Sequence, residues 1–151
     1  MTKTRYVNSY RDLIVYMRSR QLSQKVFLIT QSFPREETYS LIDQVRRSSR
    51  SIGAQIAESW AKRNYEKHFT SKLSDADSEV QETRPWGEIS LDCGYITTET
   101  AEELLQTCDE IGRMLGGMIQ KAHLFCVKDA HLRESTAVYW ADSSHDPASD
   151  H

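Results

Sequence analysis

The chain has 151 residues, of which 38% are hydrophobic and 27% charged, a balance typical of one globular domain large enough to bury a core. No apolar run approaches the roughly 20 residues that a membrane-spanning helix needs, and the N-terminal MTKTRYVN lacks the apolar stretch of a secretory signal. The three cysteines, Cys93, Cys108 and Cys126, form no CxxC pair, which disfavours a disulfide framework or a zinc site. We therefore expect a cytoplasmic protein with reduced thiols and no membrane segment.

The net charge of −3 conceals a strong asymmetry between the two halves of the chain. From Met1 to Lys72 there are 14 Lys and Arg residues against 6 Asp and Glu, whereas from Leu73 to His151 there are 5 against 16. A basic half can form a face for an anionic partner such as nucleic acid. Alternatively, the two halves neutralise each other inside a helical bundle or across a contact between subunits.

Helical periodicity is the main signal in the first half of the chain. The first helix is expected from about Arg11 to Gln31 and ends before Phe33-Pro34, because the residue before a proline disfavours helical torsion angles. Its expected inward positions recur at steps of three and four residues and are widened by three aliphatic side chains: Tyr16, Ser19, Ser23, Val26, Thr30 and Phe33, with Leu13, Leu22 and Ile29. Glu36 and Glu37 open the second helix, where acidic side chains complement the helix dipole. The inward positions of the second helix are Leu41, Val45, Ser49, Ile52, Ile56 and Trp60.

The third helix is expected after a turn near Arg63-Asn64. Its inward positions are Phe69, Leu73, Ala76, Val80, Thr83, Gly87 and Leu91. Pro85 lies inside this helix, and an interior proline removes a backbone hydrogen bond. We therefore expect a kink between Glu82 and Trp86, with Trp86 displayed beside it.

The fourth helix is expected to follow the segment DCGYITTE. Gly94 suits the position just after a helix end, and Thr97 or Thr98 can cap the next helix start. The helix is expected to run to about Ala122. Its inward positions are Leu104, Cys108, Ile111, Leu115, Met118 and Ala122.

Four amphipathic segments joined by short connections predict an all-α fold, an antiparallel up-down four-helix bundle. Steps averaging about 3.5 residues favour left-handed, coiled-coil-like packing. We expect the bundle domain to occupy residues 1–126. The polar residues 127–151 are expected to form a flexible C-terminal tail, in which Val138, Tyr139 and Trp140 can dock locally or touch a neighbour.

Patterns that carry catalysis or metal binding are scarce. There is no GxGxxG, GxxxxGK[ST] or GxSxG motif and no Glu-x-x-His pair, and His68 and His123 have no helical partner at ligand spacing. Glu79 and Glu82 lie one turn apart and can act as acid and base, although this spacing is more typical of a solvated face or of partners for arginine. The two glycines of MLGGMI (Met114 to Ile119) are expected to let a neighbouring helix approach closely. We expect no enzyme activity, no metal and no cofactor.

The stretch QVRRSSRSIGAQIAESW (Gln44 to Trp60) carries the strongest candidate site. Arg46 and Arg50 lie one helical turn apart with Arg47 beside them, which makes a compact cationic patch. Arginine binds phosphate through two parallel hydrogen bonds, so these three residues and Arg63 are the candidate nucleic-acid-binding residues. Alternatively, the arginines pair with an adjacent subunit or with acidic residues of the third helix: Asp75, Glu79 and Glu82. Small residues of the same stretch permit close helix approach: Ser48, Ser49, Gly53, Ala54 and Ala57.

The segment FPREETYSLIDQVRRSSRSIGAQIAES resembles the hallmark segment of the four-helix bundle proteins encoded by intervening sequences in bacterial 23S ribosomal RNA genes. The family pattern of Phe-Pro, a Glu pair, Leu-x-x-Gln-x-x-Arg and Ser-Ile-x-x-Asn-Ile-Ala-Glu-Gly is matched at Phe33, Pro34, Glu36, Glu37, Leu41, Gln44, Arg47, Ser51, Ile52, Ile56, Ala57 and Glu58. DLIVYMRSRQLSQKVFLIT, ETRPWGEISLDCGYI and EIGRMLGGMI resemble the family's opening helix, third-helix end and final helix, so the resemblance covers roughly Tyr10 to Cys126. Three positions depart from the pattern: Gln55 replaces Asn, Ser59 replaces Gly, and Pro85 is unusual.

The resemblance implies a bundle that assembles into a ring, a homopentamer, without enzymatic activity and without catalytic residues to transfer. The family is also similar to accessory proteins of diversity-generating retroelements, which are strongly basic, bind nucleic acid and partner a reverse transcriptase. This chain is mildly acidic overall, but a ring would collect its arginine patches into one band. The resemblance thus favours a non-catalytic oligomer associated with structured RNA or DNA. The alternative is a protein-interaction scaffold, such as a reverse-transcriptase accessory protein, with no direct RNA role.

Overall fold

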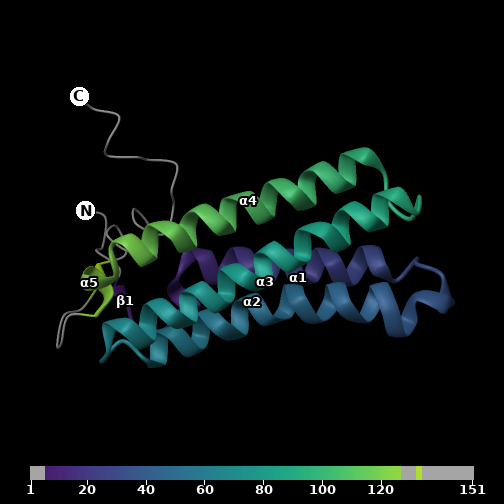
Figure 1. Ribbon diagram of the computed structural model, residues 1–151. Helices are drawn as coiled ribbons and strands as arrows, with labels where there is room; N and C mark the ends of the chain where they lie inside the picture. Colours follow the sequence, from purple (N-terminus) through teal and green to yellow (C-terminus); the bar gives the residue numbers. More distant parts are fainter. Residues whose placement is uncertain (1–5, 127–131, 134–151) are drawn as a thin grey trace.

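Four long helices dominate the computed structural model, which describes residues 6–126 and 132–133 (Figure 1). They are α1 (Ile14–Thr30), α2 (Asp43–Ala61), α3 (Glu66–Asp92) and α4 (Thr98–Gln120). Shorter elements flank them: β1 (Tyr6–Val7), 3-10 helices at Tyr10–Asp12 and Arg35–Glu37, a π-helical turn at Thr38–Ile42, α5 (Ala122–Phe125) and β2 (Leu132–Arg133). The predicted all-α fold is confirmed.

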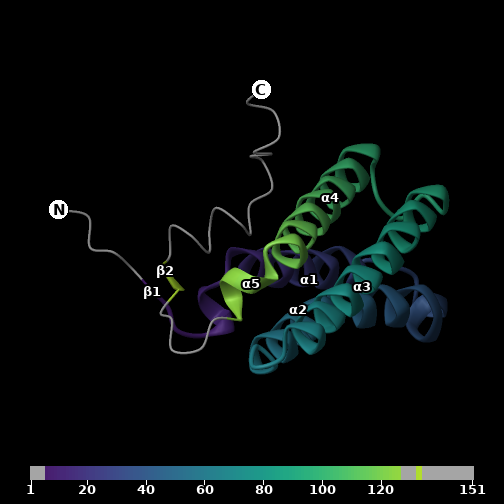
Figure 2. The same ribbon diagram turned by 60° about the vertical axis from the view of Figure 1, so that its left-hand side comes forward.

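Successive long helices run in opposite directions, so the connections alternate between the two ends of the bundle (Figures 1 and 2). α2 packs against α1 and α3, and α4 closes the arrangement by packing against α3 and α1. This is the antiparallel up-down four-helix bundle that the sequence predicts. Within the part of the chain that the structure describes, no helix has the length and apolar character needed to cross a membrane.

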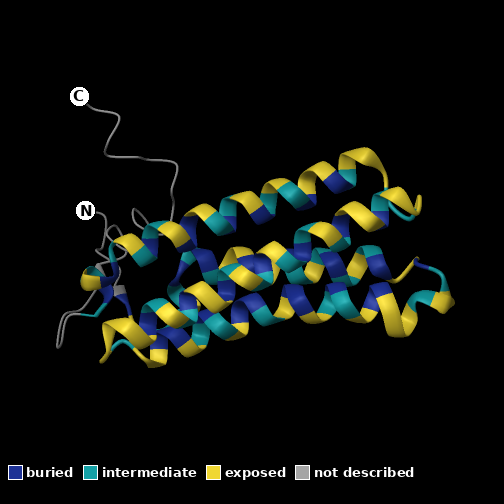
Figure 3. Ribbon diagram, viewed as in Figure 1, coloured by how far each residue is buried: buried dark blue, intermediate teal, exposed yellow. Residues whose placement is uncertain are grey.

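The inward faces of α2, α3 and α4 agree closely with the predicted stripes (Figure 3). All six positions predicted for the second helix and all six predicted for the fourth are buried. In α3 the prediction is wrong only at Leu91, which is half-buried, because the neighbouring Ser90 faces inward instead. These helices therefore use the 3.5-residue repeat as a continuous core-facing seam.

The stripe predicted for α1 needs a correction. Tyr16 and Ser23 are only half-buried, whereas the residues immediately before them, Val15 and Leu22, are fully buried. The core face of α1 is thus rotated toward its aliphatic side chains, because these gain most from leaving water. The helix also starts later than expected, at Ile14, because Ser9 caps a separate 3-10 helix before it.

Close helix approach is confirmed at Gly53 of α2. A Cβ atom at this position would lie 3.0 Å from Ser19 Oγ and 3.4 Å from Tyr16 Cε2, both on α1. The expectation is not met for Gly116 of α4, because no described atom lies within 4 Å of a Cβ built there. Gly87 of α3 is packed as closely, since a Cβ there would lie 2.5 Å from Leu104 Cδ2 of α4.

The link between α3 and α4 forms as the sequence predicts. Gly94 has a positive φ of 73°, which favours glycine, and it follows Cys93, the C-cap residue of α3. Gly94 N–H donates to the Leu91 carbonyl and Tyr95 N–H to the Ser90 carbonyl, the pair of bonds that closes a Schellman motif. Thr97 then caps α4 by accepting a hydrogen bond from the Thr100 backbone N–H.

A small second core lies at the end of the bundle where α1 meets α2 and α3 meets α4. Phe33, Leu41 and Ile42 form its buried centre, and Trp86 and Tyr95 pack against it. Pro85 is exposed and α3 continues through it to Asp92, so the proline does not end the helix. Trp86 is half-buried between the two cores, and the expectation that it is displayed at the surface is therefore wrong.

The opposite end of the bundle is closed by α5. Phe125 of α5 stacks on Phe69 of α3, with 5.8 Å between ring centroids, and both side chains are fully buried. β1 pairs antiparallel with β2 nearby, a contact that the sequence pattern does not predict. Most of the expected tail, residues 127–131 and 134–151 with Val138, Tyr139 and Trp140, lies outside the described residues.

Candidate nucleic-acid interface

Arg46 and Arg50 project from α2 toward α1 and lie over the ring of Phe27. The Arg46 guanidinium carbon is 4.9 Å from the ring centroid and that of Arg50 is 5.9 Å from it. Arg46 Nε also donates a hydrogen bond of 2.8 Å to Thr30 Oγ1. A guanidinium over an aromatic face is attracted by the ring electrons and keeps its other N–H groups free to bind a ligand.

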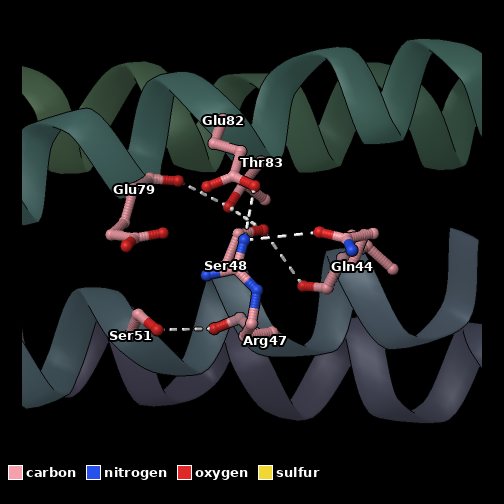
Figure 4. A network of polar contacts seen from close by, with 8 residues as sticks. Gln44, Arg47, Ser48, Ser51, Glu79, Glu82 and Thr83 are labelled. Atoms are coloured by element: carbon pink, nitrogen blue, oxygen red, sulfur yellow. Dashed lines mark hydrogen bonds and ion pairs between the residues drawn. The ribbon is translucent and has the colours of Figure 1, made fainter. Parts of the chain in front are cut away.

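Arg47 has a different environment, because successive residues of a helix point in directions about 100° apart. It reaches toward α3, where Arg47 Nη2 lies 2.6 Å from Glu82 Oε1, and it also donates to Gln44 Oε1 at 3.3 Å (Figure 4). The pairing alternative therefore holds for Arg47. Arg46 and Arg50 do not pair with the third helix, because among the described residues no carboxylate lies within ion-pair distance of either guanidinium. Pairing with an adjacent subunit stays an alternative for both.

Arg63 lies far from these three arginines. It follows the C-terminal end of α2, and the rise of a helix places it about 25 Å from Arg46 along the axis. Its guanidinium lies 3.6 Å from the ring centroid of Trp60, and its Nε donates to the Trp60 carbonyl at 3.0 Å. Burial there lowers the pKa of Arg63 from its ordinary value. Arg63 thus does not join the cationic patch of Arg46 and Arg50.

Three adjoining hollows line the outer face of α1 and α2. The largest, of about 600 Å³, follows α2 from Tyr39 to Ala54 and contains Arg46, Arg47 and Arg50. The second, of about 570 Å³, shares Arg46, and the third, of about 310 Å³, shares Arg50. We call this continuous surface the α1–α2 groove; its charged and aromatic residues used below are Arg20, Phe27, Arg35, Tyr39, Asp43, Arg46 and Arg50.

The groove is basic, because five arginines and one acidic residue line its three hollows. Arg18, Lys25 and Arg84 form ion pairs with carboxylates of α4, namely Glu110, Glu103 and Asp109. Arg18 and Lys25 belong to the basic half and their partners to the acidic half, so the alternative of neutralisation between the halves holds on that side of the bundle. Arg84 and Asp109 both belong to the second half. The one acidic residue of the groove lining is Asp43, which lies in the largest hollow.

Glu79 and Glu82, the candidate acid–base pair, lie between α3 and α2 rather than in the groove. Burial is the main cause that raises the pKa of Glu79, and repulsion from Glu82 adds to it. Glu82 is held by Arg47, and Thr83 Oγ1 donates to Ser48 Oγ at 2.9 Å beside them (Figure 4). None of the three hollows of the groove is lined by either carboxylate. Among the described residues, no three His, Cys, Asp or Glu side chains gather closely enough to hold a metal ion.

Sequence reasoning missed the aromatic residues of this surface. Phe27 lies beneath the two guanidinium groups. Tyr39 lines the largest hollow and has 92% of its surface exposed. A signal was present in the helical spacing, since Tyr39, Asp43, Arg46 and Arg50 recur at steps of four and three residues beside the buried stripe.

Comparisons with known proteins agree with the fold. Residues 11–117 match a family model described as 23S rRNA-intervening sequence protein. The chain is also similar to a solved structure from Bacteroides thetaiotaomicron VPI-5482, a protein of unknown function from the S23 ribosomal protein family. The two share 29% sequence identity and a TM-score of 0.63, over 71% of this chain and 99% of that one. A comparison with curated proteins finds no match.

Proposed function

This chain belongs to the family of 23S rRNA-intervening sequence proteins, and from that premise we propose that it is a non-catalytic, nucleic-acid-associated protein. In this proposal the α1–α2 groove contacts the phosphate groups of RNA or DNA. The observation that carries it is the position of Arg46 and Arg50. Both line an open groove without a carboxylate partner among the described residues, whereas other basic side chains of the bundle are paired with α4.

Phosphate chemistry suits this arrangement. An arginine whose guanidinium lies over Phe27 and donates to Thr30 is oriented in advance, so less side-chain entropy is lost when phosphate binds. Arg20 and Arg35 extend the positive surface to either side. Contacts of this kind give affinity and position the protein, but they carry no sequence information. We therefore expect selectivity to come from the shape of the nucleic acid.

Double substitution of Arg46 and Arg50 tests the proposal. The Arg46→Ala/Arg50→Ala variant is expected to bind structured RNA at least about tenfold more weakly, because two phosphate contacts are lost. Arg113→Ala, which removes one positive charge, provides a control, since Arg113 is exposed on α4 on another face of the bundle. Equal affinity of the double variant and the control would contradict the proposal. Helical content measured by circular dichroism verifies that both variants fold.

A second candidate function is a protein-interaction scaffold. In this role the chain assembles into a ring with copies of itself or binds a protein such as a reverse transcriptase. Exposed apolar side chains on α1, Met17 and Leu28, favour it, and so does the open surface at Gly116 of α4. The homopentamer expected from the resemblance belongs to this candidate as well as to the first. Particle mass separates the two roles of the arginines: the scaffold role predicts that Arg46→Ala/Arg50→Ala dissociates the assembly, whereas the phosphate role predicts that the mass is retained.

A further inference from the structure

Tyr39 is the most exposed of the large hydrophobic side chains that the structure describes, with 92% of its surface accessible. It belongs to the π-helical turn at Thr38–Ile42, directly before α2. A single exposed aromatic residue is ordinary on a protein surface. What distinguishes Tyr39 is its place, because it lines the same hollow as the two unpaired arginines of the groove.

The spacing of these residues matches an extended ligand. Tyr39 and Arg50 lie on one face of the helix, about 16 Å apart along its axis, with Arg46 between them. Tyr39 is the one aromatic residue that lines the largest hollow, and its ring is exposed. Phe27 lines the neighbouring hollow, and the guanidinium groups lie over its ring. Asp43 lies one turn beyond Tyr39, between the ring and the arginines, and repels a phosphate at that point. The phosphate contacts are therefore displaced toward the arginines and the aromatic contact toward Tyr39.

Base pairing decides which nucleic acid can use such a surface. In a duplex the base faces are stacked inside, and an aromatic side chain reaches them only after a base is flipped or unstacked. In a single strand the base faces are available, and they stack on aromatic side chains while the backbone follows a basic groove. We infer that the α1–α2 groove binds an unpaired nucleic-acid strand, with its phosphates at Arg46 and Arg50 and a base stacked on Tyr39.

The inference rests on the proposed function and adds the class of ligand to it. Its test measures binding of the full chain to four probes of about 12 nucleotides, within the site sizes known for single-strand-binding proteins. The probes are an RNA strand, the DNA strand of the same sequence, the RNA annealed to its complement, and a strand of equal length that carries phosphates but lacks bases. Two variants accompany the protein: Tyr39→Leu removes the aromatic face, and Tyr39→Phe keeps it as the matched control.

Stacking predicts that at least one intact single strand binds about tenfold more tightly than the abasic strand and the duplex. Tyr39→Leu is expected to abolish that advantage without weakening binding of the abasic strand, while Tyr39→Phe retains it. Because the Tyr39 side chain is exposed, neither substitution removes a core contact. Equal affinity for intact and abasic strands, or an advantage that survives Tyr39→Leu, would overturn the inference.

The arginine variant keeps the two proposals distinguishable. If Arg46→Ala/Arg50→Ala weakens binding of all probes but intact and abasic strands bind alike, the inference fails and the proposed function stands. If no probe responds to the arginine substitutions, or none binds, both fail together.

Discussion

Arg47 and Glu82 form an ion pair between α2 and α3, with 2.6 Å between Nη2 and Oε1, while the adjacent Arg46 lies over Phe27 of α1. Two consecutive arginines thus point to different sides of the same helix. One binds the acidic half of the chain and the other faces the groove. The patch of three arginines divides into one paired residue and two that remain available to phosphate.

Glu82→Gln is expected to increase affinity for nucleic acid about threefold. The substitution removes the charge that holds Arg47, and an exposed ion pair of this kind is worth about 0.2–1 kcal/mol. Arg47, which also lines the largest hollow, then becomes available to the ligand. Glu102→Gln is the matched control, because it makes the same change in net charge at an exposed position of α4. An equal gain in both variants would show that net charge, not the release of Arg47, changes the affinity.

Glu79→Gln is expected to stabilise the protein at neutral pH. Because the folded protein raises the pKa of Glu79, mainly through burial, the ionised carboxylate is unfavourable in the fold above that pKa. The wild type regains this lost stability as the pH falls toward the ordinary value for glutamate, about 4.3. Urea unfolding at several pH values should therefore show the largest advantage of Glu79→Gln near neutrality and none near pH 4.3. An advantage that does not change with pH would contradict the assignment.

Alanine substitution should change the stability differently at Gly53 and Gly116, because the two glycines have different surroundings. Gly116→Ala is expected to raise the free energy of unfolding by about 1 kcal/mol, because Ala favours a helix and nothing described crowds its Cβ. Gly53→Ala gains the same propensity but places a Cβ 3.0 Å from Ser19 Oγ, so the buried Ser19 side chain must shift by a few tenths of an ångström. We expect Gly53→Ala to be less stable than Gly116→Ala by about 1 kcal/mol or more. Equal free energies of unfolding for the two variants in urea would show that the contact with Ser19 relaxes without loss of stability.

Thiol labelling should follow the position of each cysteine in the bundle. Burial raises the pKa of Cys108 to about 11, and its side chain is inaccessible, so it carries almost no thiolate at a pH of about 8. Cys93 is exposed just after α3 and is expected to be alkylated first. Mass spectrometry of peptides from folded and unfolded protein measures this order, with Cys93→Ser as the control. Alkylation of Cys108 in the folded protein at the rate of Cys93 would contradict the core assignment.

Most of the fold is predictable because the buried positions of its helices recur at regular steps. The positions from Leu41 to Trp60 and from Leu104 to Ala122 follow one seam, and Gly94 and Thr97 mark a helix end and start by their own chemistry. The error in α1 arises where polar and aliphatic residues alternate, since periodicity alone cannot decide whether Val15 or Tyr16 faces inward. In the structure the aliphatic Val15 is buried, and Tyr16 packs beside Gly53 of α2.

The candidate site is less predictable, because it depends on which helices face each other. Three acidic residues of α3 were possible partners for three arginines, and only the packing of α2 on α3 selects Arg47 and Glu82. Asp75 instead lies 3.6 Å from Lys72. Arg63 was grouped with the patch by residue type, although the length of α2 separates it from Arg46. The spacing that links Tyr39 to Asp43 and the arginines is visible in the sequence, but only the packing of α1 beside α2 shows that this face borders a groove.

The most direct test of the account is the salt dependence of nucleic-acid binding by the wild type and the Arg46→Ala/Arg50→Ala variant. Each phosphate contact contributes a slope of about −0.7 for a single strand and about −0.9 for a duplex in log K against log salt. The account predicts that the double substitution makes the slope less steep by about 1.4 for a single strand while the particle mass is unchanged. An unchanged slope, or no binding by the wild type at low salt, would contradict it and make the groove a surface for protein contacts.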